Sequence, residues 1–217
     1  MGSHSSPSLP PSSRRSSRPI PEIVRAGSFT ILFVCTGNIC RSPLAERLLT
    51  SKLASLGDDD RGSIRVESAG LQTANGIAMD ATAAREGLRL GAQTSGVKSR
   101  VLDRPISMKA NVLLTMTREQ QIDLVKRYPV LLRRTFTVRE FARILSFGPK
   151  IEAESETIAR RSILTVEKAS TIRSSFAVQA IDDDIPDPYC KGDAMHRHVA
   201  DMIEIAVSTM VSEMFAI

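Results

Sequence analysis

Two hydrophobic patterns alternate along the chain from Ser28 onward. Short unbroken apolar runs at 29–35 and 110–116 are rich in β-branched and aromatic residues, which is typical of strands buried on both faces of a sheet. The segment 63–70 predicts another strand, and 135–137 a fourth. Because segments with apolar residues at helical spacing lie between these strands, the order predicts an open parallel sheet with helices on both faces.

Capping residues mark where the first helices begin and end. After the first strand, Ser42 is a favourable N-cap and Pro43 suits the first helical position. Further along, Asp80 is expected to begin a helix that Gly91 ends. The chain from the first strand onward therefore predicts strand, turn, helix, strand, helix.

Four more helices are predicted in the second half of the chain. The sequences at 117–120 and 137–140 both match the capping box, and each should open a helix. Residues 193–216 place methionines and aliphatic residues at helical spacing, which indicates a helix facing the core. Within 148–180, the spacing of apolar residues also favours an extra helix.

Segment composition predicts one domain with a tail. Residues 1–27 are rich in Ser, Pro and Arg with little apolar content, so disorder is expected there, and the opening MGSH resembles an expression-tag remnant. The remaining 28–217 predict a single domain with an insert at about 148–180. The 217 residues, 42% of them hydrophobic, are enough for one sizeable core.

Charge and cysteine content narrow the class of protein. The formal net charge of +5 is partly local, since the first 27 residues contribute +3, and the chain has no Trp and only two Tyr. A nucleic-acid partner is therefore not expected. No apolar run approaches the roughly 20 residues of a membrane span, and no secretory signal is evident. Three cysteines, an odd number, favour reduced thiols and a cytoplasmic protein.

The stretch FVCTGNICRSPLAE at 33–46 carries the candidate chemistry. It runs from the end of a buried strand into a helix, where open α/β sheets bind ligands and where helix N–H groups favour an anion. Loop amides, Arg41 and the Ser42 hydroxyl would all stabilise a Cys35 thiolate. Such surroundings lower a thiol pKa from about 8.5 to about 3.5–7.5. The alternative is that Cys35 merely ends a strand and Arg41 is solvated.

Two small residues are expected to let this turn curl. Gly37 relieves the steric bar to unusual backbone dihedrals, and Asn38 tolerates left-handed geometry and can hydrogen-bond its own loop. The loop N–H groups could then point inward. Arg41 would add a planar fork able to hold two phosphoryl oxygens at once.

Here the sequence resembles a known family. VCTGNICRSPLAE looks like the signature loop of the low-molecular-weight protein tyrosine phosphatases, and the segments at 67–71, 110–116, 139–142 and 184–189 resemble later segments of that family in the same order. The resemblance implies a three-layer α/β fold with a twisted, four-stranded parallel sheet of order 2-1-3-4. It also implies hydrolysis of phosphotyrosine esters through a phosphocysteine, with no metal and no cofactor.

The resemblance assigns a role to particular residues. Cys35 would be the nucleophile, Arg41 the phosphoryl clamp, and Asp187 the general acid and then the base. Thr36, Ile39 and Tyr189 would line the substrate cleft. The phosphate-binding loop would comprise Thr36, Gly37, Asn38, Ile39, Cys40, Arg41 and Ser42. For Asp187 the alternative is a solvated acidic loop, since three aspartates stand just before it.

Two positions near the loop leave questions open. Members of this family with a second cysteine at the Cys40 position can close a reversible disulfide, so Cys40 is either a redox partner of Cys35 or a buried, inert thiol. The family commonly braces the loop Asn through a histidine, but Val97 occupies the matching position here. The brace of Asn38 is therefore not identified from the sequence.

Two other functions compete with the phosphatase hypothesis. A thiol-dependent arsenate reductase on the same fold would use the same loop, and a catalytically inactive phosphotyrosine-binding module would keep the cleft without the chemistry. The expected partners are a phosphotyrosine protein, which the family suggests is a tyrosine kinase or a polysaccharide-export regulator, and inorganic phosphate or another oxyanion in the loop.

Overall fold

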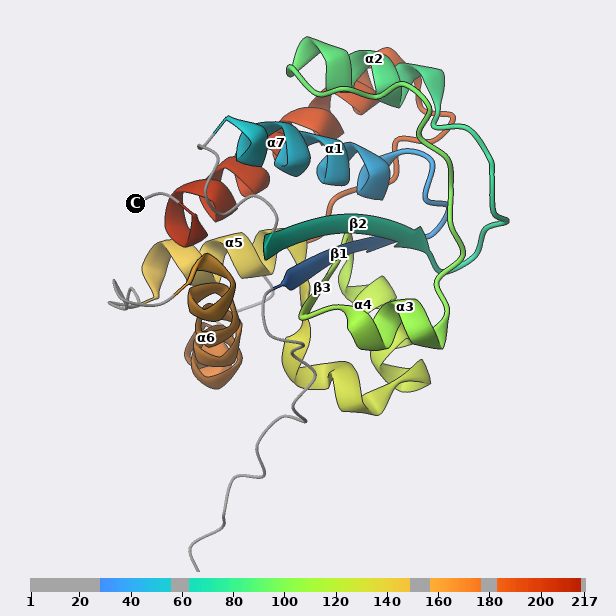
Figure 1. Ribbon diagram of the computed structural model, residues 1–217. Helices are drawn as coiled ribbons and strands as arrows, with labels where there is room; N and C mark the ends of the chain where they lie inside the picture. Colours follow the sequence, from blue (N-terminus) through green and yellow to red (C-terminus); the bar gives the residue numbers. More distant parts are fainter. Residues whose placement is uncertain (1–27, 56–62, 149–156, 177–182, 216–217) are drawn as a thin grey trace, which may run out of the picture.

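The computed structural model contains one four-stranded parallel sheet of order β2-β1-β3-β4 (Figure 1). It describes residues 28–55, 63–148, 157–176 and 183–215. The strands are β1 (Phe29–Cys35), β2 (Ile64–Gly70), β3 (Val112–Thr115) and β4 (Thr135–Thr137). The predicted strands, their order and their parallel direction are confirmed. The tail at 1–27, predicted to be disordered, lies outside the described residues.

The register brings four strand ends to one edge of the sheet. Cys35 lies opposite Gly70, Val34 opposite Thr115, and Thr115 opposite Thr137. All four strands therefore end at the same edge, from which their carboxyl-terminal loops project. In open α/β sheets this edge is where ligands bind.

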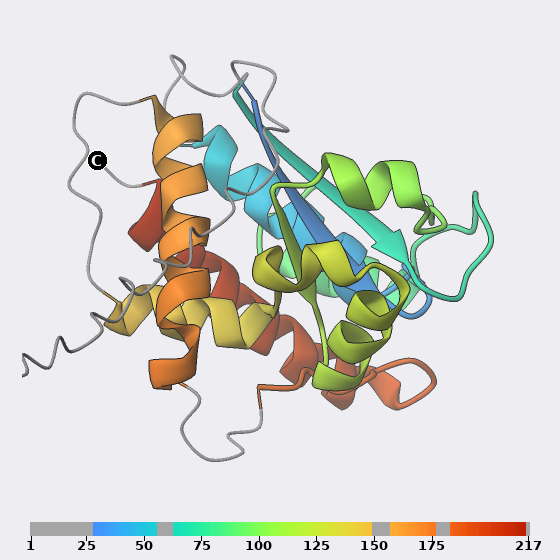
Figure 2. The same ribbon diagram turned by 90° about the horizontal axis from the view of Figure 1, so that it is seen from below.

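Helices cover both faces of the sheet, as predicted. Figure 1 shows α1, α2 and α7 on one face and α3 and α4 on the other, and Figure 2 gives the view from below. The helices are α1 (Arg41–Ala54), α2 (Ala81–Arg89), α3 (Arg104–Lys109), α4 (Arg118–Arg127), α5 (Val138–Phe147), α6 (Ile158–Ile172) and α7 (Gly192–Met214), with 3-10 helices η2 (Pro129–Arg134) and η3 (Arg173–Phe176).

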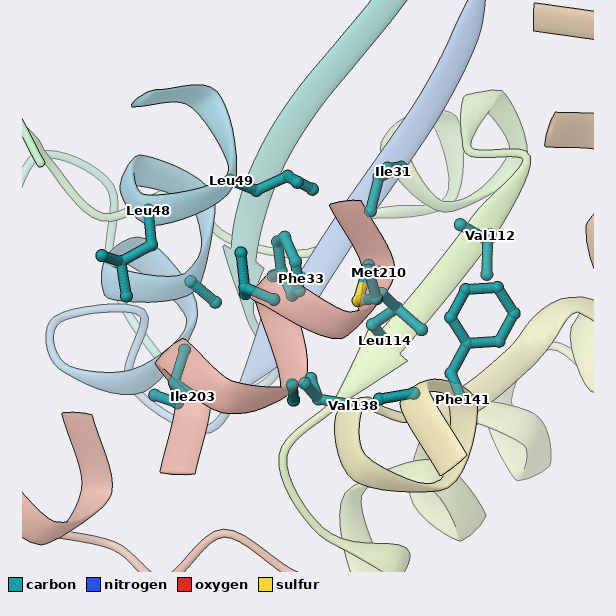
Figure 3. Packing of buried hydrophobic residues seen from close by; sticks show 14 of the residues in the cluster. Ile31, Phe33, Leu48, Leu49, Val112, Leu114, Val138, Phe141, Ile203 and Met210 are labelled. Atoms are coloured by element: carbon teal, nitrogen blue, oxygen red, sulfur yellow. The ribbon is translucent and has the colours of Figure 1, made fainter. Parts of the chain in front are cut away.

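The central strand supplies side chains to both hydrophobic layers. Ile31 and Phe33 belong to the larger core, which includes buried residues of α1, α5 and α7 (Figure 3). Leu32 and Val34 point the opposite way, into a smaller core that includes Leu124 of α4. Because successive side chains of a strand alternate between faces, one apolar run fills both layers.

The helix predicted within the insert is present as α6 and packs into the larger core. Its buried residues Ala159, Val166 and Ala169 belong to the same cluster as the central strand. At the end of α6, Arg173 forms two hydrogen bonds of 2.7 Å with the carboxylate of Glu140. The helix is therefore an integral layer of the fold.

Local capping chemistry sets most helix boundaries as predicted. The Asp80 side chain accepts two backbone N–H bonds at the start of α2, and Gly91, at φ 84°, follows the end of that helix. Both predicted capping boxes are present, at Thr117 in α4 and at Thr137 in α5. Within the described residues, no helix is both long and apolar enough to cross a membrane.

Candidate active site

The Cys35 thiol lies buried at the end of β1, where the chain turns into α1. Its Sγ atom is 2.9 Å from the Ser42 hydroxyl and accepts the backbone N–H of Asn38 at 3.2 Å. Both contacts stabilise a sulfur that carries negative charge. The N-terminus of α1 also faces this loop, and its partial positive charge acts in the same sense.

The prediction that Ser42 caps α1 is wrong. The helix begins at Arg41, Cys40 occupies the N-cap position, and no side chain caps the first turn. The Ser42 hydroxyl instead contacts Cys35 and accepts a hydrogen bond from the Asn38 amide at 2.9 Å. The Ser42 side chain therefore hydrogen-bonds within the loop, although serine's local preference would be to cap the N-terminus of α1.

Asn38 is the residue that bends the loop. It has φ 51°, in the left-handed region, and Gly37 is not among the positive-φ residues of the described chain. The left-handed residue of this loop is therefore Asn38 and not Gly37, and Asn tolerates this region better than most residues. A methyl group at Gly37 would meet only the Ile39 side chain, at an ordinary 3.5 Å.

A polar network, rather than a histidine, holds the Asn38 side chain. Its amide donates at 2.9 Å to the hydroxyls of both Ser42 and Ser68. Its carbonyl oxygen accepts the backbone N–H of Arg100 at 2.7 Å. Ser68 in turn donates to the Glu46 carboxylate. These partners brace Asn38 where Val97 cannot, and Val97 itself is a buried apolar residue.

Gly70 is required at the end of β2, which the sequence pattern did not single out. A Cβ atom there would lie 2.8 Å from the Thr36 carbonyl oxygen and 2.7 Å from the Thr73 side chain. The Thr36 carbonyl is fixed, because it accepts the backbone N–H of Gln72 at 2.9 Å. Gly70 therefore permits the close approach of β2 to the candidate phosphate loop.

Arg41 reaches from the first turn of α1 to the loop that carries Asp187. One guanidinium nitrogen donates to the Ile185 carbonyl at 3.1 Å, and another pairs with the Asp187 carboxylate at 2.7 Å. The Arg41 side chain is only 5% exposed, whereas that of Asp187 is 47% exposed. A buried cation and a solvent-accessible carboxylate thus meet beside Cys35.

Three contacts fix the loop that presents Asp187. The backbone N–H of Ile185 donates to the Met116 carbonyl at the end of β3. The Asp184 carboxylate accepts the backbone N–H of Arg118 at 2.6 Å. Asp183 pairs with Arg143 of α5 at 2.7 Å. Asp183 and Asp184 are thus anchors of this loop, and the alternative of a merely solvated acidic cluster does not describe them, whereas Asp182 lies outside the described residues.

The predicted site residues, with one exception, line a pocket of about 280 Å³. Ser42 is the exception: it is fully buried, and its hydroxyl contacts the Cys35 sulfur. The pocket is also lined by three residues that the sequence analysis did not identify as site residues, namely Gln72, Thr73 and Ile77. The half-exposed side chains of Ile77 and Tyr189 are apolar surface at this pocket. The lining residues are Cys35, Thr36, Gly37, Asn38, Ile39, Cys40, Arg41, Gln72, Thr73, Ile77, Asp187 and Tyr189.

The Cys40 thiol is buried beside several negative groups. Burial, followed by the charges of Asp80, Cys35 and Asp187, raises its pKa to about 12. Cys40 is therefore a neutral thiol at physiological pH. A neutral thiol is a poor nucleophile toward an oxidised sulfur, which favours the inert alternative over the redox one.

Gln120 joins the candidate phosphate loop to α4 and was not predicted to do so. As the third residue of a capping box, its side-chain oxygen accepts the N–H of Thr117. The same amide donates to the Thr36 hydroxyl at 3.0 Å. The capping signal could be seen in the sequence, but the second contact joins residues 84 positions apart.

Comparison with known proteins identifies the family. The model of the low molecular weight phosphotyrosine protein phosphatases matches residues 30–146, more than half of the chain. The chain therefore belongs to that family. The low molecular weight protein-tyrosine-phosphatase Etp of Escherichia coli K12 is 28% identical over 177 residues, covering 82% of this chain and 88% of that protein.

Two further comparisons concern a sequence relative and a solved structure. A protein-arginine-phosphatase of Geobacillus stearothermophilus is 32% identical over 117 residues, which cover 52% of this chain and 71% of that protein. The crystal structure of a low molecular weight protein tyrosine phosphatase from T. tengcongensis superposes with a TM-score of 0.62 at 22% identity, covering 85% of this chain and 99% of that one. The two proteins therefore share their fold.

Proposed function

We propose that this protein hydrolyses phosphotyrosine in proteins through a phosphocysteine intermediate. The observation that carries the proposal is the meeting of the Cys35 sulfur, the Arg41 guanidinium and the Asp187 carboxylate in one pocket. Nucleophile, anion clamp and proton donor are the three groups that metal-free phosphoryl transfer to a thiolate requires.

In the first step, the Cys35 thiolate attacks phosphorus and the bond from phosphorus to the tyrosine oxygen breaks. Asp187, in its protonated form, gives its proton to the departing phenolate oxygen. General acid catalysis of this kind contributes about 10²–10⁴-fold. Arg41 and the loop amides bind the phosphoryl oxygens and stabilise their charge in the transition state.

In the second step, water attacks the phosphocysteine. Asp187, now ionised, accepts a proton from that water, the bond from sulfur to phosphorus breaks, and inorganic phosphate and the Cys35 thiolate are released. The half-exposed position of Asp187 suits this role, because water can reach its carboxylate. Ser42 and the N–H of Asn38 stabilise the thiolate both before attack and as it leaves.

The walls of the pocket favour an aryl ester. Ile39, Ile77 and Tyr189 line it together, and an aromatic ring buries apolar area against such side chains. We therefore place a phosphotyrosine ring there rather than a phosphorylated guanidinium, although one relative is described as a protein-arginine-phosphatase. A tyrosine kinase or a polysaccharide-export regulator is the physiological substrate that the resemblance suggests. Free cysteines at all three positions accord with a reducing compartment, the cytoplasm.

Hydrolysis of p-nitrophenyl phosphate by the purified chain tests the proposal. Turnover should persist in EDTA, be blocked by vanadate and vanish in Cys35→Ser, whereas Cys190→Ser, which removes an exposed thiol outside the pocket, should retain it. Phosphotyrosine peptides should be hydrolysed faster than phosphoarginine peptides, and phosphatase turnover should exceed any arsenate-dependent oxidation of added thiols. Undiminished turnover in Cys35→Ser would refute the mechanism, and binding without turnover would favour the inactive module.

A further inference from the structure

A second pocket, of about 340 Å³, adjoins the first and is not used by the chemistry above. Thr36, Arg41, Gln72 and Asp187 line both pockets, so the two form one continuous depression. A protein substrate whose phosphorylated side chain enters the first pocket must lay its neighbouring residues across the surface around it. The second pocket lies within reach of those neighbours, since an extended chain advances about 3.3 Å per residue.

Helix α4 gives this second pocket a negative wall. Glu119 and Asp123 lie four residues apart on α4 and both line the pocket. Glu119 is exposed and forms no hydrogen bond or ion pair with any residue in the described part of the chain. Asp123 is half-buried and already pairs with Arg127 at 3.4 Å. Glu119 is therefore the carboxylate open to a cation entering from solvent, and Asp123 adds its negative charge to the same wall.

The rest of the lining suits a long side chain with a charged end. Leu71 supplies apolar surface, while Gln72, Thr117 and Gln120 supply polar atoms. Lysine and arginine carry an aliphatic stem that packs on apolar surface and a charged head that stays among polar groups. The one cation in the lining, Arg41, donates to the Ile185 carbonyl and pairs with Asp187, and in the proposed mechanism it serves the phosphoryl group in the first pocket.

We propose that this second pocket binds a lysine or arginine that flanks the phosphotyrosine of the substrate, with its charge against Glu119 and Asp123. The inference rests on the proposed function, because it names the substrates of that same site. It runs against the overall field of the chain, whose formal net charge of +5 attracts acidic peptides. A preference for basic flanks would therefore report on this pocket and not on the net charge.

The expected preference is moderate. Two ion pairs near the surface give a preference of about two- to thirtyfold for the basic peptide. Salt screens such pairs, so the preference should shrink when ionic strength is raised.

Peptide binding to the Cys35→Ser chain tests the inference without turnover. Fluorescence anisotropy would compare two phosphotyrosine peptides that differ only in carrying lysine or glutamate at the three positions on each side. The same pair would be measured on Cys35→Ser combined with Glu119→Gln and Asp123→Asn. The matched control combines Cys35→Ser with Asp201→Asn, which removes a surface carboxylate of α7 that pairs with Arg89.

The lysine peptide should bind about two to thirty times more tightly than the glutamate peptide to Cys35→Ser and to the Asp201→Asn control. The preference should disappear or reverse with Glu119→Gln and Asp123→Asn. Tighter or equal binding of the glutamate peptide to Cys35→Ser, binding of neither peptide, or a lysine preference that survives the double substitution would overturn the inference. Failure of the proposed function would be seen separately, as absent turnover by the unsubstituted chain.

Discussion

Replacing Asn38 by alanine should destabilise the candidate phosphate loop, because the Asn38 side chain forms three of the hydrogen bonds that hold it. The substitution removes both amide hydrogen bonds and the acceptor of the Arg100 N–H. Two of the partners keep other contacts, because Ser42 still meets Cys35 and Ser68 still donates to Glu46. The Arg100 N–H is the group that loses its partner.

The cost can be worked from these contacts. A half-buried N–H left without an acceptor costs about 1–3 kcal/mol, and alanine at φ 51° adds about 1 kcal/mol of backbone strain. The free energy of unfolding should therefore fall by about 2–4 kcal/mol. Asn38→Gly also removes the side chain but adopts the left-handed region freely, so it should lose about 1 kcal/mol less.

Urea unfolding of the wild type, Asn38→Ala and Asn38→Gly provides the assay, with kcat/KM for p-nitrophenyl phosphate as the second readout. Both variants should lose activity, because the N–H of residue 38 would no longer be held toward the Cys35 sulfur. Unfolding free energies within about 0.5 kcal/mol of wild type, the usual range for a surface substitution, would refute the reasoning.

Three further substitutions or measurements test other parts of the structure. Gly70→Ala forces the Thr36 carbonyl away and should cost about 1–3 kcal/mol in urea unfolding and lower kcat/KM; a wild-type unfolding midpoint would contradict this. Burial alone would raise the pKa of Glu140, but the hydrogen bonds and charge of Arg173 outweigh burial and lower that pKa below 4.5. The ion pair between Arg173 and Glu140 therefore stabilises the folded state above pH 4.5, and this stabilisation is lost as pH falls through the lowered pKa. Arg173→Met should therefore destabilise the chain by about 2–4 kcal/mol at pH 7, and the difference from wild type should shrink as pH falls through the lowered pKa of Glu140; a constant difference would be inconsistent with the pair. Because the pKa of Cys40 is raised to about 12, iodoacetamide at pH 7 should leave Cys40 unmodified in the folded protein, as read by peptide mass spectrometry, and rapid labelling would argue against its burial.

The fold could be predicted because its determinants are local. The apolar run of β1 fills both layers, and each capping box closes within four residues, so neither depends on distant contacts. The helix α6 was also indicated by its own spacing. Its ion pair from Arg173 to Glu140 was not, because it joins residues 33 positions apart.

The candidate site was only partly predictable for the same reason. Cys35 and Arg41 lie in one contiguous motif, whereas the brace of Asn38 comes from Ser68 and Arg100, which are 30 and 62 positions away. Ser42 illustrates how tertiary contacts override local preference: its hydroxyl contacts Cys35 instead of capping α1. Pairings of this kind depend on strand register, which the sequence pattern does not specify.

The most direct test of the account asks where the phosphoryl group goes. The chain would be mixed with p-nitrophenyl phosphate, quenched within one turnover, digested and mapped by mass spectrometry. The account predicts a phosphoryl group on Cys35 alone, absent when Cys35→Ala is treated in the same way. Phosphorylation of another residue, or sustained turnover by Cys35→Ala, would contradict it.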